Sequence, residues 1–315
     1  MRIKVGLFFS EGNYNMLSYS KTYLSPTDLI ANLKAKGMVI SSASTAEEKI
    51  KQIGYYRLKG YFYTFYDNST NTYPNTKFDG ILSIYEFDTK LSRLLFDYLL
   101  KIEVTLRARL TEAFRQTNDV LPLYNPSYFV DKHRFWENYA SMASEIARSS
   151  DHFIKYNYDN HDGVIPVWAI VEVLQYGTLS KIIKNLKTGI GTVFNTLASN
   201  YSIPTNSNTM HTPSPNMFTS WIQATASIRN ICAHGGRIYK RVISSSLPAL
   251  TTQDAIHPAP KYTGVYNYIL AMKYLRPDDV SWRNFVSELT NLISQYSAVV
   301  QTTDLFFPTD WSAHL

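Results

Sequence analysis

Residues 79–116 read DGILSIYEFDTKLSRLLFDYLLKIEVTLRARLTEAFRQ. Apolar side chains recur here at intervals of three and four residues, the spacing that places them on one face of a helix. They are Leu91, Leu94, Leu95, Tyr98, Leu99, Ile102, Leu106, Leu110 and Ala113. We therefore predict a long buried helix at the centre of the fold, within which Asp88 is a candidate cap for a second segment. Glu103 and Arg107 are four residues apart, a spacing that allows a solvated ion pair of roughly 0.3 kcal/mol. We favour a structural role for both residues, and the secondary interpretation is that Arg107 or Arg109 lines an RNA groove.

Helical signals also flank this stretch on both sides. Ser25 followed by Pro26 is typical of a helix start, and Gly37 of its end. Ser44 with Glu47 forms a capping-box pattern for a second helix that reaches about residue 53. Further helices are expected at 135–148, 166–174, 180–186, 266–274 and 282–300. Residues 200–216 are rich in Asn, Ser, Thr and Pro, and are predicted to form a connecting loop.

The segment 220–234 has two faces when it is read as a helix at about 100° per residue. The apolar sector holds Trp221, Ile222, Thr225, Ile228 and Cys232, and the opposite sector holds Gln223, Ser227, Asn230 and His234. Arg229 lies at the edge of the apolar sector, so its long side chain is expected to reach round to the polar face. Gly235 and Gly236 are typical of a helix C-terminus.

Arg229, Asn230 and His234 suit the cleavage of RNA through its own 2′-hydroxyl. His moves protons near neutral pH, Arg offsets charge that grows on the phosphate, and an Asn amide orients either group. A His near a helix C-terminus is also a common capping choice, so a structural role stays open. The sequence has no dense cluster of metal-ligating residues and no Gly-rich phosphate loop, and we predict no metal, no cofactor and no nucleotide hydrolysis.

Composition narrows the class of protein. The chain has 315 residues, a formal net charge of +6 and a pI of about 9.1. Cys232 is the only cysteine, which excludes an internal disulfide, fits a reducing compartment and predicts a small buried residue. Residues 1–17 hold only a short apolar patch at 7–9, so we expect no membrane span and a cytoplasmic location. Arg237, Lys240 and Arg241 follow the motif and are candidate contacts to an RNA backbone.

Several blocks along the chain resemble abortive-infection proteins of the AbiD/AbiF type, a bacterial anti-phage family within the HEPN superfamily. The likeness spans about residues 19–241. The order and spacing of the blocks make it specific, although each block alone is weak. The blocks are Tyr55-Tyr56-Arg57-Leu58-Lys59-Gly60-Tyr61, Tyr85-Glu86-Phe87-Asp88-Thr89-Lys90-Leu91, Ile102-Glu103-Val104-Thr105-Leu106-Arg107, Pro166-Val167-Trp168-Ala169 with Glu172 and Gly177, Ser220-Trp221, and Arg229-Asn230-Ile231-Cys232-Ala233-His234.

HEPN ribonucleases carry an Arg-x(4–6)-His motif, which Arg229, Asn230 and His234 match. The resemblance implies that Arg229 and His234 are catalytic and that Asn230 assists them. It also implies an RNA substrate, a homodimer in which two motifs face one RNA and, as in some members, a small structured non-coding RNA as partner. The chain departs from the pattern after the motif, where Gly236 replaces a frequent second His and Tyr239-Lys240-Arg241 replaces an aromatic-polar-Asn-Arg tail.

Together these features predict a mainly α protein. We expect an N-terminal helical region at 1–78 and a HEPN-like bundle at 79–315, with the motif helix near 218–234. The predicted function is a toxin-like, metal-independent endoribonuclease of phage defence. Two alternatives remain: a non-catalytic module that binds RNA or a partner, in which the motif is a structural cap, and an enzyme that transfers nucleotide groups.

Overall fold

The computed structural model describes residues 22–204, 209–243 and 264–315, and the fold is mainly α, as predicted. None of the helices in these ranges is long and apolar enough to cross a membrane. The apolar patch predicted at residues 7–9 lies outside the described residues.

Twelve α-helices and one pair of short strands make up the described part of the chain. They are α1 Pro26–Ala35, α2 Ala43–Ile53, α3 Tyr55–Phe62, α4 Phe78–Arg115, α5 Lys132–Arg148, α6 His152–Asn160, α7 Val167–Val173, α8 Tyr176–Asn185, α9 Val193–Ser199, β1 Ile203–Pro204, β2 Met210–His211, α10 Pro215–Ala233, α11 Val265–Tyr274 and α12 Asp279–Gln295. Short 3-10 helices include η1, Tyr63–Phe65.

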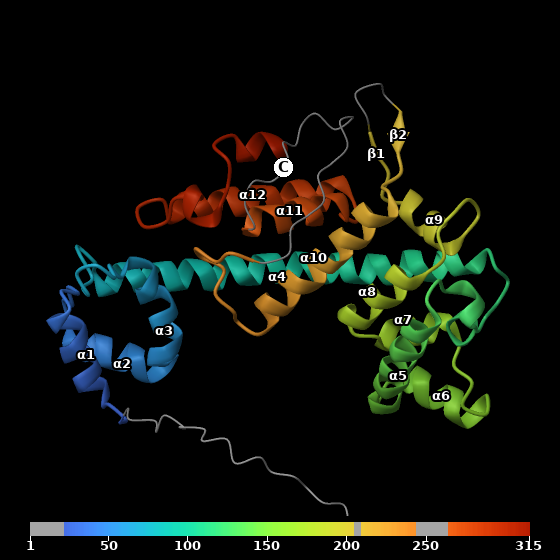
Figure 1. Ribbon diagram of the computed structural model, residues 1–315, viewed down its shortest axis with the longest axis horizontal. Coiled ribbons are helices and arrows are strands. Elements are labelled where there is room, and N and C mark those ends of the chain that lie inside the picture. Colours follow the sequence, from blue (N-terminus) through green and yellow to red (C-terminus); the bar gives the residue numbers. More distant parts are fainter. Residues whose placement is uncertain (1–21, 205–208, 244–263) are drawn as a thin grey trace, which may run out of the picture.

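Helix α4 is the axis of the molecule. It runs uninterrupted for 38 residues along the length of the fold, with α1–α3 at one end and α5–α9 at the other (Figure 1). Helix α12 packs along α4, and α10 crosses it. The predicted apolar stripe is buried except for Leu94, which is half-buried. The division of the chain at residue 78 stays a prediction, and the rings of Phe62 and Phe78 are in contact across it with centroids 5.9 Å apart.

Helix starts follow the local sequence closely. Ser25 caps α1 by accepting a hydrogen bond from the backbone N–H of Asp28, and Pro26 begins the helix. Helix α2 begins two residues earlier than the predicted capping box implies, because its N-cap is Ser42, whose hydroxyl accepts the backbone N–H of Thr45. Each cap satisfies a backbone donor that has no partner within its own helix.

The predicted loop at 200–216 contains regular structure. Strands β1 and β2 pair in antiparallel fashion, with Ile203 opposite His211. The turn between them, residues 205–208, lies outside the described residues. The sequence did not show these strands because each is only two residues long.

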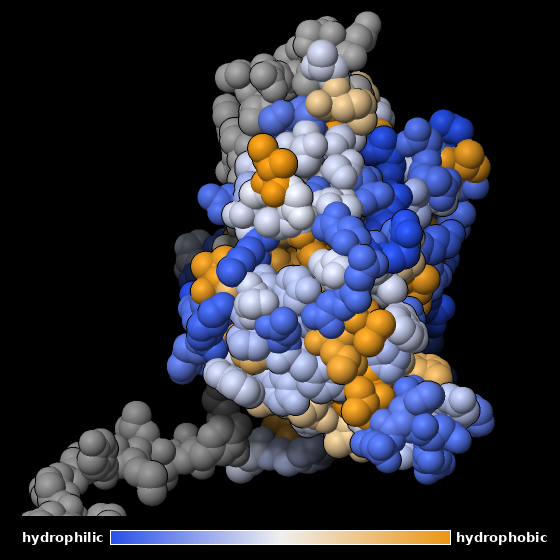
Figure 2. Space-filling model, turned by 90° about the vertical axis from the view of Figure 1, so that its right-hand side faces the viewer, coloured by the Kyte–Doolittle hydropathy of each residue, from blue (hydrophilic) through white to orange (hydrophobic). Residues whose placement is uncertain are grey.

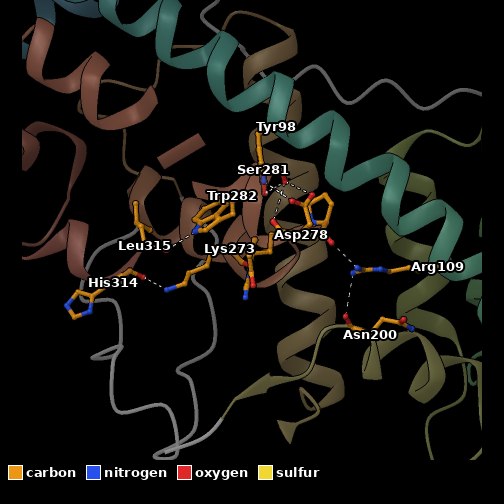
Figure 3. A network of polar contacts seen from close by, with 12 residues as sticks. Tyr98, Arg109, Asn200, Lys273, Asp278, Ser281, Trp282, His314 and Leu315 are labelled. Carbon is orange, nitrogen blue, oxygen red and sulfur yellow. Dashed lines mark hydrogen bonds and ion pairs between the residues drawn. The ribbon is translucent and has the colours of Figure 1, made fainter. Parts of the chain in front are cut away.

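Polar contacts fasten α4 to the C-terminal helices (Figure 3). The Tyr98 hydroxyl lies 3.4 Å from Ser281 Oγ at the start of α12. Arg109 donates to the carbonyl of Pro277 at 3.2 Å and its guanidinium lies over the Tyr201 ring. Trp282 Nε1 donates to the Leu315 carbonyl at 2.7 Å. Arg109 is thus engaged in packing α4 against neighbouring segments.

Asp88 does not cap a second segment of α4, contrary to the sequence-based expectation. It lies inside the helix, 2% exposed, and accepts hydrogen bonds from the backbone N–H of Ile238 at 2.9 Å and of Tyr239 at 2.8 Å. The Tyr61 hydroxyl donates to it at 2.7 Å. Burial raises the pKa of Asp88, and the three hydrogen bonds act in the opposite direction. Asp88 therefore fixes the chain that follows α10.

We predict that Asp88→Ala destabilises the protein by on the order of 3 kcal/mol, because three buried donors lose their acceptor. Hydrogen exchange should also accelerate at the amides of Ile238 and Tyr239. Asp97→Ala is the matched control, since Asp97 is exposed on the same helix. Urea unfolding and exchange rates that match those of the control would show that Asp88 does not hold this segment.

Candidate functional site

Helix α10 carries the motif and has the two faces that the sequence predicts. It packs against α4, α8 and α11, and its five predicted apolar-face residues are all buried. Trp221 stacks on Tyr274 with ring centroids 4.7 Å apart, and Thr225 Oγ1 lies 2.7 Å from the Tyr176 hydroxyl. On the opposite face Ser227, Asn230 and His234 are exposed and Gln223 is half-buried.

The C-terminus of α10 closes in a Schellman motif. The N–H of Gly236 donates to the Ile231 carbonyl at 2.8 Å, and that of Gly235 to the Cys232 carbonyl at 3.0 Å. Gly235 has a φ of +60°, which favours glycine. A Cβ at Gly236 would lie 3.2 Å from the Ile231 carbonyl oxygen, so the turn leaves little room for a second His there.

Asn230 and His234 stand free at this end of α10. Both are exposed, and within the described part of the chain neither side chain makes a hydrogen bond or ion pair. The backbone beneath them is held by other elements. Arg57 of α3 donates to the Gly235 carbonyl, and Ser92 Oγ of α4 donates to the Cys232 carbonyl at 3.4 Å. An exposed imidazole thus sits on a fixed helix end, from which it can exchange protons with a ligand.

We expected the Arg229 side chain to reach the polar face of α10, and the structure shows that it does not. Its guanidinium lies against α4, where Nε is 3.5 Å from Glu103 Oε2 and the group lies 5.6 Å from the centre of the Phe96 ring. Its side chain remains 30% exposed. Arg229 and His234 are five positions apart, about 140° around a helix, so one copy of α10 directs them to different sides.

The Glu103–Arg107 pair is buried rather than solvated, which agrees with the structural role favoured for the two residues. Glu103 is 5% exposed, because α10 covers it, and its Oε1 accepts from Arg107 while its Oε2 faces Arg229. Arg107 also donates to the carbonyls of Glu172 and Leu174, which end α7. One buried carboxylate therefore joins two guanidinium groups that belong to different helices, and the cluster keeps a net positive charge.

The three basic residues predicted to bind RNA are half-buried and have partners within the chain. Lys240 Nζ lies 3.2 Å from Asp304 Oδ1 and over the Phe65 ring. Arg237 donates to the Tyr239 carbonyl at 2.6 Å, and burial lowers its pKa. Arg241 donates to the Arg237 carbonyl at 3.3 Å. All three belong to the segment that follows the motif in the chain.

Three residues that support the motif were not assigned to it from the sequence. Arg57, Asp88 and Glu103 lie on α3 and α4, more than a hundred positions before His234, yet they contact the end of α10 or the chain after it. The available signal was that each belongs to a block that carries the family resemblance. Cys232, predicted to be a small buried residue, is buried, and burial raises the pKa of its thiol to about 11.

A groove of about 830 Å³ lies over α6 and α7, at the end of the molecule that faces the viewer in Figure 2. Apolar side chains show there among polar ones, and Trp168, 52% exposed, lines the groove. His152 and His161 also line it and are exposed. Across the described ranges no group of three His, Cys, Asp or Glu side chains could hold a metal ion.

The segment that holds these contacts matches a known family. The model of the family described as Abi-like protein matches residues 48–240, which is more than half of the chain. The chain belongs to the Abi-like protein family. The match covers Arg57, Asp88, Glu103, Arg229 and His234 of this Abi-like protein. No curated protein and no solved structure matches it.

We predict that Glu103→Gln destabilises this Abi-like protein by on the order of 3 kcal/mol, because two guanidinium groups lose the charge of their buried partner. Glu112→Gln on the same helix is the control, since the Glu112–Arg115 pair is exposed and little change is expected there. Chemical unfolding measures both variants. Equal midpoints and slopes for the two would rule out a structural role for the Glu103 charge.

Proposed function

We propose that this Abi-like protein is a metal-independent endoribonuclease of a phage-defence system, a toxin-like enzyme that acts in the cytoplasm. The observation that carries the proposal is an exposed His234 on a fixed helix end, with Asn230 one turn before it. Arg229 lies on another side of the same helix, next to Glu103 of α4. Membership of the Abi-like family supports it. So does the resemblance of Arg229, Asn230 and His234 to the motif of HEPN ribonucleases.

The chemistry assigns each side chain a role. The ribose 2′-oxygen attacks the adjacent phosphorus, and its proton leaves as the bond from phosphorus to the 5′-oxygen breaks. His234 moves this proton or returns one to the 5′-oxygen. Arg229 offsets the charge that develops on the phosphate, and Asn230 orients the phosphate or the imidazole. The products are a 2′,3′-cyclic phosphate and a 5′-hydroxyl.

A homodimer with a HEPN-like arrangement would complete this site. Because Arg229 and His234 point to different sides of one α10, a second copy can supply the group that is missing from the first. Two copies also bring two imidazoles to one RNA backbone, one to accept a proton and one to donate it. Arg237, Lys240 and Arg241 would then hold the RNA beside the motif by charge.

The engagement of Arg229 with a buried carboxylate favours a second function. An arginine whose role is to join α10 to α4 fits a non-catalytic module. Such a module would bind RNA or a partner, would work with a small structured RNA, and would cleave no RNA. Such a module predicts RNA affinity that falls with rising salt and no cleavage products.

We predict that His234→Ala lowers the rate of RNA cleavage by about 100-fold or more. The variant should keep its stability, because the side chain is exposed and makes no contact that the fold requires. Initial rates on a labelled oligoribonucleotide, together with thermal unfolding, measure both effects.

His152→Ala is the control, because His152 is an exposed histidine on α6, distant from the motif. His152→Ala should cleave at the wild-type rate. Cleavage by His234→Ala at that same rate would contradict the catalytic assignment. Intact RNA that is bound by the wild type would favour the non-catalytic module.

A further inference from the structure

A cavity of about 1320 Å³ opens between α1, α2 and α3 and the chain that follows η1. Aromatic rings and amines line it. We call it the tyrosine pocket, and its defining residues are Lys36, Tyr55, Tyr56, Lys59, Tyr63 and Tyr66. Tyr56 is 75% exposed and Tyr63 59% exposed, so both rings present faces to a ligand. Large aromatic side chains are usually buried, which makes this exposure informative.

The charge in the tyrosine pocket has one sign. Its lining includes Lys36, Lys51 and Lys59 and no Asp or Glu. Lys51 is 3.6 Å from Glu47, whereas Lys36 and Lys59 have no carboxylate within 4 Å in the described chain. Lys36 Nζ lies 5.3 Å from the centre of the Tyr66 ring, and Lys59 Nζ 5.4 Å from that of Tyr56. The pocket thus pairs free ammonium groups with ring faces.

We propose that the tyrosine pocket binds an unpaired nucleotide of RNA. A base stacks on the exposed ring of Tyr56 or Tyr63, while Lys36 and Lys59 bind the flanking phosphates. Paired bases are hidden within a duplex, so the ligand is single-stranded. This inference rests on the proposed action on RNA and adds the place where the RNA is held.

The tyrosine pocket adjoins the motif through α3 and η1. On α3, Tyr56 and Lys59 line the pocket, whereas Arg57 donates to the Gly235 carbonyl. A Cβ at Gly60 would lie 3.9 Å from Arg237 Nε. In η1, the Phe65 ring lies 5.0 Å from Lys240 Nζ. One helix, about 10 Å wide, therefore separates the pocket from the chain after His234, and a short single strand can span that distance.

Binding of a labelled, unstructured oligoribonucleotide tests the proposal, with all variants made in full-length His234→Ala protein to exclude cleavage. Tyr56→Ala with Tyr63→Ala should weaken binding roughly 5- to 100-fold, with the salt dependence unchanged. Lys36→Gln with Lys59→Gln should lower the slope of log Kd against log salt by about 1.4, since two phosphate contacts are lost. The matched controls are Tyr158→Ala and Lys155→Gln on α6, at the opposite end of the molecule, which should bind like the parent.

Each outcome decides the matter. Pocket variants that bind like the controls overturn the proposal, and so does a parent that binds no RNA. If only the lysine variants bind RNA more weakly, the pocket is a general site for anions, and the proposal that it recognises a nucleotide is overturned. The same pocket substitutions are also made in protein that retains His234. If the wild type cleaves RNA and these variants cleave it equally well, the ribonuclease stands and the pocket fails. Binding that depends on the pocket, with no cleavage by the wild type, supports the pocket and rejects the ribonuclease.

Discussion

A carboxylate buried between two guanidinium groups sets how the main helices of this protein meet. Glu103 projects from the middle of α4 and faces Arg107 on its own helix and Arg229 on α10. Removing one partner of such a cluster leaves an uncompensated buried charge, whereas the intact cluster is tolerated inside the fold. Through Arg107 the same carboxylate is connected to the carbonyls that end α7. Helices α4 and α10 thus meet around a buried carboxylate that faces a guanidinium group from each of them.

The blocks that carry the family resemblance share a structural purpose. Arg57 holds the turn after α10, Asp88 holds the two residues beyond Arg237, and Glu103 holds Arg229. These side chains come from α3 and α4, yet they converge on the C-terminal end of one helix. That end presents His234 and Asn230 to solvent. A fixed support beneath a free imidazole is what a site for proton transfer requires, because small displacements of the reacting groups cost much of the rate.

Local sequence patterns predicted the main helices, whereas the roles of individual polar residues depend on contacts between distant parts of the chain. The stripe from Leu91 to Ala113 predicted α4, and the sectors of 220–234 predicted which face of α10 is buried, because helical periodicity is a property of neighbouring residues. A helix cap and a solvated ion pair are the roles that an isolated helix would give to Asp88 and Glu103. Each also has a partner more than a hundred positions away, Ile238 and Tyr239 for Asp88 and Arg229 for Glu103, where no spacing rule applies. No spacing rule predicts the tyrosine pocket as a unit either, since its rings and amines come from the end of α1, from α2 and α3, and from the residues in and after η1.

The chemical identity of RNA ends tests the central claim most directly. Purified wild-type protein is incubated with RNA in EDTA, and the termini of the fragments are determined. The account predicts 2′,3′-cyclic phosphate on one fragment and 5′-hydroxyl on the other, because the 2′-oxygen of the RNA is the nucleophile and His234 moves the proton. Fragments that carry 3′-hydroxyl and 5′-phosphate, or cleavage that occurs only when magnesium is restored, would contradict it.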